Sequence, residues 1–389
     1  MFFVADVQTG FGPFVAVYLT AQKWTQIDIG IVLSVAGLVA LAGQMPGGAL
    51  VDAARSERLV GGLAVAGIAM SGLAYAAWPI YPVVATAAML HAMASCVLGP
   101  AIAAISLGLV GPTMISERLG RNARFASLGN GFAAALMGAC GYLLSSRSVF
   151  IVAFVLAIPT LLALVRIRER EVDAARAHGF VPPSAPEAKS TKVLVLLRQR
   201  PLLVFAGSIL LLQLANAAML PLMAGIVTTR SSKWATVLIA ACIIVPQAIV
   251  ALASPSVGRK ARAWGRRPLL LLGFAALAVR GLLFATVHDP YLLVAVQVLD
   301  GITAAVFSVM IPLIVADVAF GSGHFNLAQG VVGTATGIGA SLSTLVAGYA
   351  SDVFGSSFAF AGLASVAALG LAVIWFAMPE TGPRQRACL

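Results

Sequence analysis

Twelve long apolar stretches constrain this chain more than any other feature of its sequence. Each has about the 20 mainly apolar residues that an α-helix needs to cross the hydrocarbon core of a bilayer. Backbone groups in lipid must bond within their own segment, and the stretches are too long for barrel strands, so we predict helices. The stretches are residues 2–20, 29–51, 59–80, 82–109, 123–145, 148–166, 201–227, 234–256, 268–287, 291–315, 327–351 and 355–378.

The composition agrees with a membrane protein. Hydrophobic residues make up 60% of the chain and charged residues 10%, compared with about 25% charged residues in an ordinary soluble domain. This excludes a soluble enzyme, a disordered chain and a secreted disulfide scaffold. The first stretch has no basic region before it and leads straight into further membrane stretches, so we expect no cleavable signal peptide. The four cysteines and four histidines are scattered, so we expect no metal site and no cofactor.

The basic residues predict the orientation. With the N-terminus placed in the cytoplasm, 20 of the 25 Lys and Arg residues fall on the cytoplasmic side. The outer side receives Lys23, Arg147, Arg230 and Lys233, and Arg280 lies inside a stretch. This distribution follows the positive-inside rule and places both termini in the cytoplasm. It also explains the net charge of +11 without a nucleic acid partner.

One segment interrupts the pattern and divides the chain. Residues 167–200 are charged and contain three prolines, so we predict a flexible cytoplasmic linker. The linker separates an N-terminal bundle of six helices, residues 1–166, from a C-terminal bundle of six helices, residues 201–389.

A repeat relates the two bundles. Residues 48–58 follow the second stretch, and residues 258–268 follow the eighth stretch, 210 residues later. Both segments begin with glycine and carry basic residues toward their end. Two six-helix halves of parallel topology are one of the known transporter architectures.

At these residues the sequence resembles the major facilitator superfamily, over essentially its whole length. The signature loop of that family reads G-x-L-A-D-x-x-G-R-R/K. The first copy here keeps Gly48, Leu50, Asp52 and Arg58, and the second keeps Gly258, Gly265, Arg266 and Arg267. The first copy has Arg55 in place of the second glycine, and the second has Arg262 in place of the acid. The resemblance implies an all-α membrane protein with twelve transmembrane helices in two pseudo-symmetric bundles.

The resemblance also implies that this loop controls a cytoplasmic gate. Asp52 ends the second stretch, where its carboxylate can accept bonds from a helix N-terminus or an arginine. Gly48 permits close helix approach. In the family such contacts lock the gate in the outward-open state. The alternative is plain positive-inside anchoring, which suits Arg266 and Arg267 equally well.

Three charged residues lie within apolar stretches, where insertion of a charge costs about 2.5–3.5 kcal/mol. They are Asp6, Arg280 and Asp300. Arg280 and Asp300 fall at depths of roughly 10 and 14 Å from the outer ends of their stretches, at about 1.5 Å per residue, so we expect them to pair.

The resemblance implies that the first, fourth, seventh and tenth helices line a central cavity. With Arg280, the predicted substrate- and proton-binding residues on these helices are Asp6, Gln8, His91, Gln213, Asn216, Gln297 and Asp300. A histidine titrates near neutral pH, and a low-dielectric cavity favours the protonated form of a carboxylate, so both types suit proton transfer. The alternatives are a packed histidine at 91, a permanent bridge at 300 and a hydrated carboxylate at 6.

These features predict a monomeric multi-pass protein of the bacterial cytoplasmic membrane, surrounded by the lipid bilayer. We expect a secondary transporter that moves a small organic solute by alternating access, coupled to protons. Export is slightly favoured because the cavity helices are mostly apolar. An uptake symporter or facilitator for an anionic metabolite is the alternative, because residues 131–141 lack the Gly-Pro of the family's antiport stretch. A membrane sensor without transport is a further class. No catalytic constellation or ATPase motif is visible, so we expect no enzyme.

Overall fold

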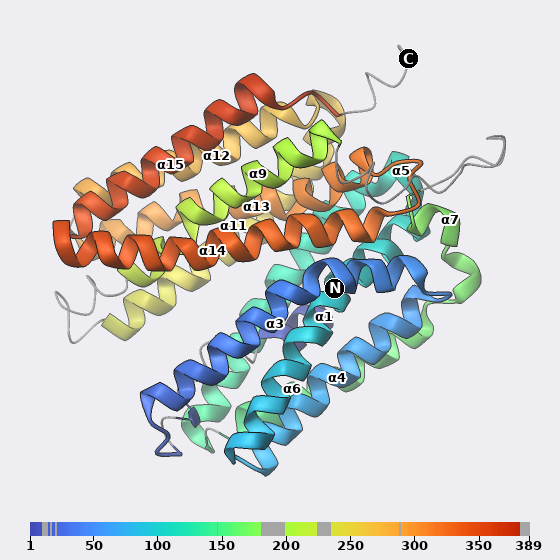
Figure 1. The fold of residues 1–389 in the computed structure, drawn as a ribbon, viewed down its shortest axis with the longest axis horizontal. Helices are drawn as coiled ribbons and strands as arrows, with labels where there is room; N and C mark the ends of the chain where they lie inside the picture. The colour runs from blue at the N-terminus through green and yellow to red at the C-terminus, as the bar shows by residue number, and fades with distance from the viewer. Residues whose placement is uncertain are drawn as a thin grey trace. The chain divides into compact units, whose positions relative to one another are not determined.

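The computed structural model describes residues 1–9, 15, 18–19, 22–145, 147–179, 199–223, 235–287 and 289–381. Every regular element in this part of the chain is a helix (Figure 1). The helices are α1 (Phe2–Thr9), α3 (Gln26–Ala53), α4 (Glu57–Ala77), α5 (Tyr81–Leu143), α6 (Ser148–Arg166), η1 (Glu169–Glu171), α7 (Ala174–Ala177), α9 (Arg200–Asn216), α11 (Ala235–Trp264), α12 (Arg267–Thr286), α13 (Pro290–Val318), α14 (Phe325–Phe354) and α15 (Ser356–Ala377).

Ten spans within the described residues are long and apolar enough to cross a membrane. The first predicted stretch, residues 2–20, lies partly outside the described residues. The fourth and fifth stretches share the single long element α5, whose helical course is interrupted only at Gly111, with φ 68° and ψ 179°. The predicted stretches end at residue 109 and begin again at residue 123, whereas in the structure the residues between them are helical apart from the turn at Gly111. A positive φ of this kind is readily adopted by glycine alone.

The helix ends use side chains to satisfy free backbone N–H groups. Thr25 accepts from Asp28 N at 3.1 Å at the start of α3, and Ser56 accepts from Leu59 N at 3.3 Å at the start of α4. Such N-caps supply the bonds that the first turn of a helix lacks. Each cap therefore satisfies one free N–H group in the first turn of α3 or α4.

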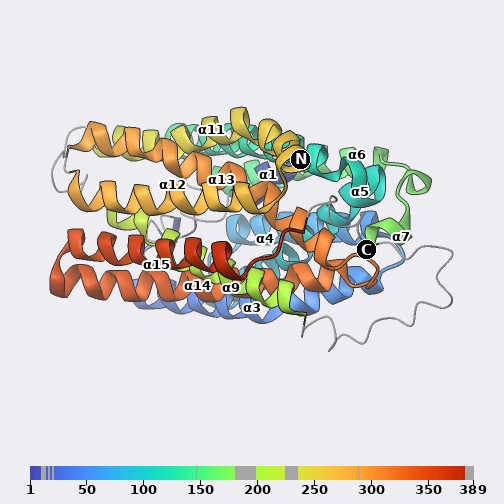
Figure 2. The ribbon, with the colours of Figure 1, turned by 90° about the horizontal axis from the view of Figure 1, so that it is seen from above.

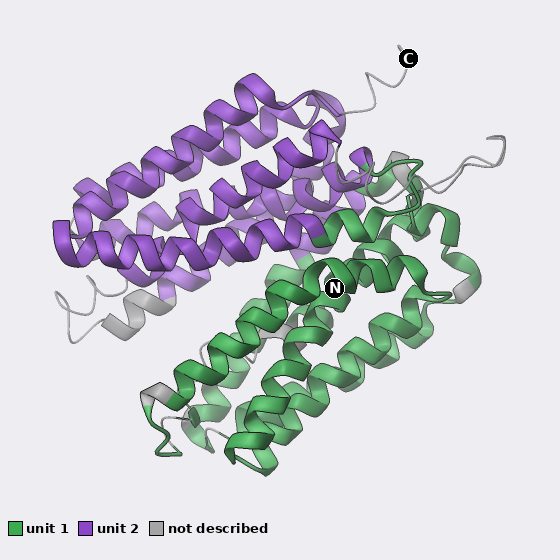
Figure 3. Cartoon of the chain, viewed as in Figure 1, with its two compact units in different colours: residues 1–115, 125–191, 319–330 green, residues 116–124, 192–318, 331–389 purple. Residues whose placement is uncertain are grey.

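The chain forms two compact units, coloured separately in Figure 3. Unit 1 comprises Met1–Ile115, Phe125–Thr191 and Ala319–Gly330, and unit 2 comprises Ser116–Arg124, Lys192–Val318 and Val331–Leu389. Each unit thus takes a short segment from the other half of the sequence.

Within unit 1, α4 packs along α6, and α1 packs against α6. Three aromatic residues occupy the core of this unit: Phe150 lies 5.0 Å from the ring of Tyr18 and 5.2 Å from that of Tyr75. The buried Tyr18 hydroxyl donates to the carbonyl of Tyr75 at 2.9 Å. This bond satisfies a polar group that lipid could not.

Within unit 2, α12 packs along both α13 and α15, and α11 packs along α13 (Figures 1 and 2). Phe274 of α12 and Phe307 of α13 meet edge to face at 5.3 Å. A side chain at Gly370 of α15 would collide with the ring of Phe274, so small residues set this helix spacing.

Two close helix crossings, one in each unit, have a glycine on both sides. A Cβ added at any of these glycines would run into the backbone of the facing helix. In unit 1, Gly48 of α3 meets the carbonyl of Asn326, and Gly330 of α14 meets that of Gln44; in unit 2, Gly258 of α11 meets the carbonyl of Ser116, and Gly120 of α5 meets that of Ser254. Every position in one crossing lies 210 residues from its counterpart in the other. The internal repeat therefore extends from the two loops to the helices that they contact.

We predict that Gly258→Ala destabilises the protein, whereas Gly207→Ala does not. Gly207 lies mid-helix in α9 with open space around its Cβ position. Both changes replace a helical glycine by alanine, so the difference isolates the collision with Ser116. We expect an overpacking cost of about 1–3 kcal/mol, measured as a lower midpoint of thermal unfolding in detergent. Equal midpoints for the two variants would contradict the close crossing.

Candidate functional site

The signature-loop carboxylate of unit 1 holds the start of α14. Asp52, near the end of α3, accepts from Asn326 N at 3.1 Å, from Asn326 Nδ2 at 2.8 Å and from Leu327 N at 2.7 Å. A carboxylate at a helix N-terminus satisfies free N–H groups and interacts favourably with the helix dipole. The structure therefore places Asp52 at a helix N-terminus, one of the two partners that the sequence analysis proposed.

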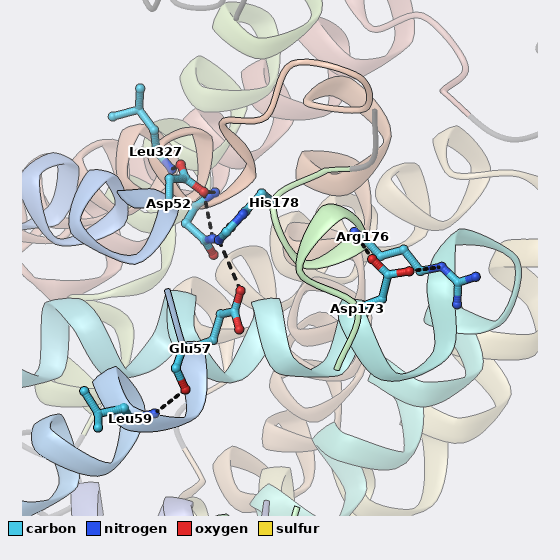
Figure 4. A network of polar contacts seen from close by, with 9 residues as sticks. Asp52, Glu57, Leu59, Asp173, Arg176, His178 and Leu327 are labelled. Carbon is cyan, nitrogen blue, oxygen red and sulfur yellow. Dashed lines mark hydrogen bonds and ion pairs between the residues drawn. The ribbon is translucent and has the colours of Figure 1, made fainter. Parts of the chain in front are cut away.

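The segment that follows α6 packs against the same place. Residues 167–179, predicted as part of a flexible linker, instead form η1 and α7, and Ala177 is fully buried. His178 lies between Asp52 and Glu57, with its Nε2 3.1 Å from Glu57 Oε1 (Figure 4). This carboxylate raises the pKa of His178 above its ordinary value, and burial opposes the shift only in part. The prolines that suggested flexibility all lie beyond residue 179, outside the described residues.

The equivalent contact in unit 2 is an ion pair of reversed polarity. Arg262, 210 residues after Asp52, donates to Glu117 at 3.2 Å. Glu117 is in turn the counterpart of Leu327. The acid thus lies on α5 rather than in the loop. Because the Arg262 and Glu117 side chains are 54% and 33% exposed, the pair is worth little in free energy.

The remaining residues of the second loop copy lie at the N-terminus of α12 and are held there by two acids. Arg266 is 4% exposed and pairs through Nε with Asp317 at 2.9 Å. Glu380 accepts from Arg266 N at 2.7 Å and from Arg267 N at 3.1 Å, and therefore caps α12. Gly265, with φ 99°, lies directly against the Glu380 carboxylate, which leaves no space for a side chain.

The basic residues of both copies bind backbone carbonyls at helix ends. Arg58 donates to the carbonyl of Ile167 at 2.8 Å, just after α6. Arg267 donates to the carbonyl of Trp375 in the last turn of α15. Cations at these positions satisfy the free carbonyls of a helix C-terminus. These contacts stabilise each unit internally.

The predicted intramembrane pair is present in unit 2. Arg280 of α12 is 1% exposed, and its Nη1 forms an ion pair with Asp300 of α13 and donates to Asn216 Oδ1 at 2.7 Å. Its guanidinium carbon lies 5.3 Å from the centre of the Phe284 ring, within cation–π range. Asp300 keeps 24% of its side-chain surface exposed. Asn216 is the last residue of α9, where the helix is interrupted by a turn.

The other predicted binding residues lie on described helices but are not all brought together. Gln297 is fully buried on α13, one turn from Asp300, and Gln213 of α9 lies beside the close approach of α14 at Gly339. His91 of α5 belongs to unit 1, and its Nε2 is 3.4 Å from the Ser95 hydroxyl. Asp6 and Gln8 are on α1, and their side chains lie outside the described part of the chain.

Sequence reasoning missed several partners of the predicted residues. They are Asn326, Glu117, Asp317, Glu380 and His178. The 210-residue offset could have found Glu117, since Asp52 and Arg262 are related by it. Asp317 lies in the last turn of α13 and Glu380 follows α15, both on the basic side, and acids at these places were a usable signal. His178 left no signal, because Glu57 and Phe325, which it joins, both lie far from it in sequence.

Two repeated helix crossings and a buried intramembrane charge pair define an integral membrane protein built from related halves. The family model for the Major Facilitator Superfamily matches residues 1–287 and 231–387. An MFS-type transporter from two strains of Mycobacterium tuberculosis is 40% identical over 385 residues, covering 98% of this chain and 91% of the relative.

The chain belongs to the major facilitator superfamily. It is a secondary transporter and an integral multi-pass membrane protein, with the expected twelve-helix fold in two pseudo-symmetric six-helix bundles.

Solved structures have the same fold. The human organic anion transporter MFSD10 matches with a TM-score of 0.70 at 16% identity, covering 96% of this chain and 97% of that one. The proton:xylose symporter XylE, solved with 6-bromo-6-deoxy-D-glucose, matches with a TM-score of 0.72 at 13% identity, covering 98% and 95%. The nucleoside transporter NupG matches with a TM-score of 0.65 at 17% identity, covering 97% and 98%.

We predict that Asp52→Ala costs much more stability than Arg262→Ala, although the two positions are equivalent in the repeat. Asp52 is a charged acceptor of three hydrogen bonds, for which about 1.5–3 kcal/mol is expected. The exposed Arg262–Glu117 pair is worth about 0–1 kcal/mol. Thermal unfolding of both variants in detergent, at low and at high salt, measures the difference. Similar losses for the two variants would contradict the assigned contacts.

Proposed function

We propose that this chain is a proton-coupled transporter of a small organic solute in a bacterial cytoplasmic membrane, with both termini in the cytoplasm and export as the favoured direction. The observation that carries the proposal is the Arg280–Asp300 ion pair, in which the arginine side chain is buried and the aspartate side chain is partly exposed. Arg280 is 1% exposed, whereas Asp300 is 24% exposed. A proton can therefore reach the carboxylate while the arginine stays inside the protein.

Protonation of Asp300 would change the energy of this site substantially. The pair would lose its ionic attraction, and Arg280 would keep only Asn216 as a polar partner among its described hydrogen bonds. Breaking one side of a buried pair typically costs about 3–5 kcal/mol. A conformational change or an arriving substrate group has to compensate this loss, and such compensation is the physical basis of coupling.

The loop contacts supply the proposed gate. Asp52 binds the first turn of α14, and Gly48 and Gly330 bring α3 and α14 into backbone contact in the same place. Breaking these few hydrogen bonds would release the first turn of α14 without disrupting a continuous apolar core. Asp6 and His91 remain further candidate proton carriers, and Gln8, Gln213 and Gln297 remain candidate substrate contacts.

A second candidate, uptake or facilitated diffusion of an anionic metabolite, is favoured by one observation. Among the described residues, two N–H donors, Arg280 Nε and Gln297 Nε2, are buried without a hydrogen-bond partner. An anionic group that displaced Asp300 from Arg280 would find these donors available. The name of one structural neighbour, an organic anion transporter, is compatible with this alternative but shows the fold alone.

We predict that Asp300→Asn abolishes solute accumulation driven by an imposed pH gradient in proteoliposomes, because the amide carries no titratable proton. Asp289→Asn is the matched control, since Asp289 is an exposed carboxylate that caps the same helix. A screen of candidate solutes by thermal shift supplies the substrate. The proton-carrier assignment fails if Asp6→Asn, His91→Ala and Asp300→Asn all retain gradient-driven transport.

We also predict that the charge swap Arg280→Asp with Asp300→Arg recovers part of the activity that either single change loses. The swap keeps the net charge of the site near zero, so the desolvation penalty of an unpaired charge is avoided. Solute exchange at equal pH on both sides separates binding from coupling. Complete inactivity of the double variant, with normal folding, would count against a functional pair.

A further inference from the structure

The segment 172–179, here called the post-α6 segment, lies against helix ends from both halves of the sequence, all within unit 1. Its start is bonded to α5, since Asp173 N donates to the carbonyl of Gly108 at 3.3 Å. Its end is bonded to the approach to α14, since Gly321 N donates to Gly179 O at 2.6 Å and Phe325 N to His178 O at 3.3 Å. The segment therefore binds the same helix start that Asp52 binds.

His178 completes this connection through both its backbone and its ring. Its main-chain carbonyl caps Phe325, and its ring pairs with Glu57 at the start of α4. Glu57 and His178 side chains are only 6% and 22% exposed, so bulk water screens the pair weakly. One residue thus links the N-terminus of α4 to the N-terminus of α14.

The charges around the ring favour its protonated form. Glu57 of α4 faces it most closely, and Asp52 of α3 also attracts its positive charge. On α5, the uncharged Gly108 and Gly111 lie against Asp173 and Arg176 of the segment, and His324 precedes α14. Within the segment, Asp173 and Arg176 are engaged with each other at 3.3 Å. The two carboxylates therefore dominate the field at His178.

We propose that protonated His178 is a positioning residue that holds the first turn of α14 against Asp52, and that its deprotonation loosens this contact. The proposal rests on the gating role of Asp52 proposed above. It makes the opening of the loop-bearing side, which the positive-inside rule assigns to the cytoplasm, depend on the pH of that compartment.

The sign follows from the pKa of His178, which the structure raises. A raised pKa means that the protonated ion pair stabilises the closed contact fully at low pH and is lost as pH rises through the shifted pKa. Acidification of the cytoplasm therefore holds the contact closed, and alkalinisation releases it.

The test measures how fast α14 becomes accessible. Ala328, one residue after Leu327, is fully buried, so Ala328→Cys reports opening in a chain whose four native cysteines are replaced by alanine. An impermeant maleimide is applied to inside-out membrane vesicles across a pH series, with rates corrected for the pH dependence of thiol reactivity on a small peptide. We expect the corrected rate to be low at the acid limit and to rise several-fold toward the alkaline limit, because the protonated His178–Glu57 pair is lost as pH rises through the raised pKa of His178.

Variants separate the proposal from a merely structural role. His178→Gln and Glu57→Gln should label fast at every pH, whereas His178→Lys, which keeps the charge, should label slowly at every pH. Arg176→Gln is the matched control on the same segment and should behave as the parent.

Asp52→Ala distinguishes the two proposals. Slow labelling of Asp52→Ala would overturn the gate itself. Fast labelling of Asp52→Ala together with a pH-independent parent would overturn only the role of His178. The readout needs neither substrate nor a proton gradient, so it stands even if coupling through Asp300 fails.

Discussion

Polar groups inside the hydrocarbon layer must find partners within the protein, because lipid provides none. This constraint explains why so few charges occur within the spans and why Arg280 is engaged by both Asp300 and Asn216. It also moves the other charged residues to helix ends, where free N–H and carbonyl groups need partners. Asp52 and Glu380 serve helix N-termini, and Arg58 serves a C-terminus. These charged residues therefore lie either in a buried pair or at helix ends.

The two copies of the signature loop stand at helix crossings of the same backbone geometry but make different polar contacts. Both crossings pair glycines through the same 210-residue offset, so the backbone geometry is repeated. The first copy joins a carboxylate to backbone N–H groups, whereas the second joins Arg262 to a carboxylate on α5. A partly buried carboxylate with three donors is a stronger and more directional contact than an exposed ion pair. We therefore expect the first crossing to dominate the control of opening.

Much of the fold was predictable because membrane spans leave a strong composition signal. The apolar stretches and the loop repeat predicted the helices and the two halves, and the depths of Arg280 and Asp300 predicted their pairing. The predictions differed from the structure where a residue type, such as a charged residue or a proline, is compatible with more than one local structure. Charged residues after Gly111 separated two predicted stretches at residues 110–122, although a helix accommodates charges wherever it leaves the lipid. Prolines beyond residue 179 led to the prediction of a flexible linker over all of residues 167–200, although the post-α6 segment is ordered. His178 depends on tertiary contacts, which no local pattern encodes.

In the proposed mechanism, Asp300 exchanges a proton while Arg280 stays buried. Infrared difference spectroscopy of the purified protein, recorded across a pH step, tests it without a known substrate. We expect an absorption band of a protonated carboxylic acid that appears on acidification, shifts in heavy water and is absent from Asp300→Asn. The same band in Asp300→Asn, or no such band in the parent protein at any pH at which it stays folded, would contradict the account.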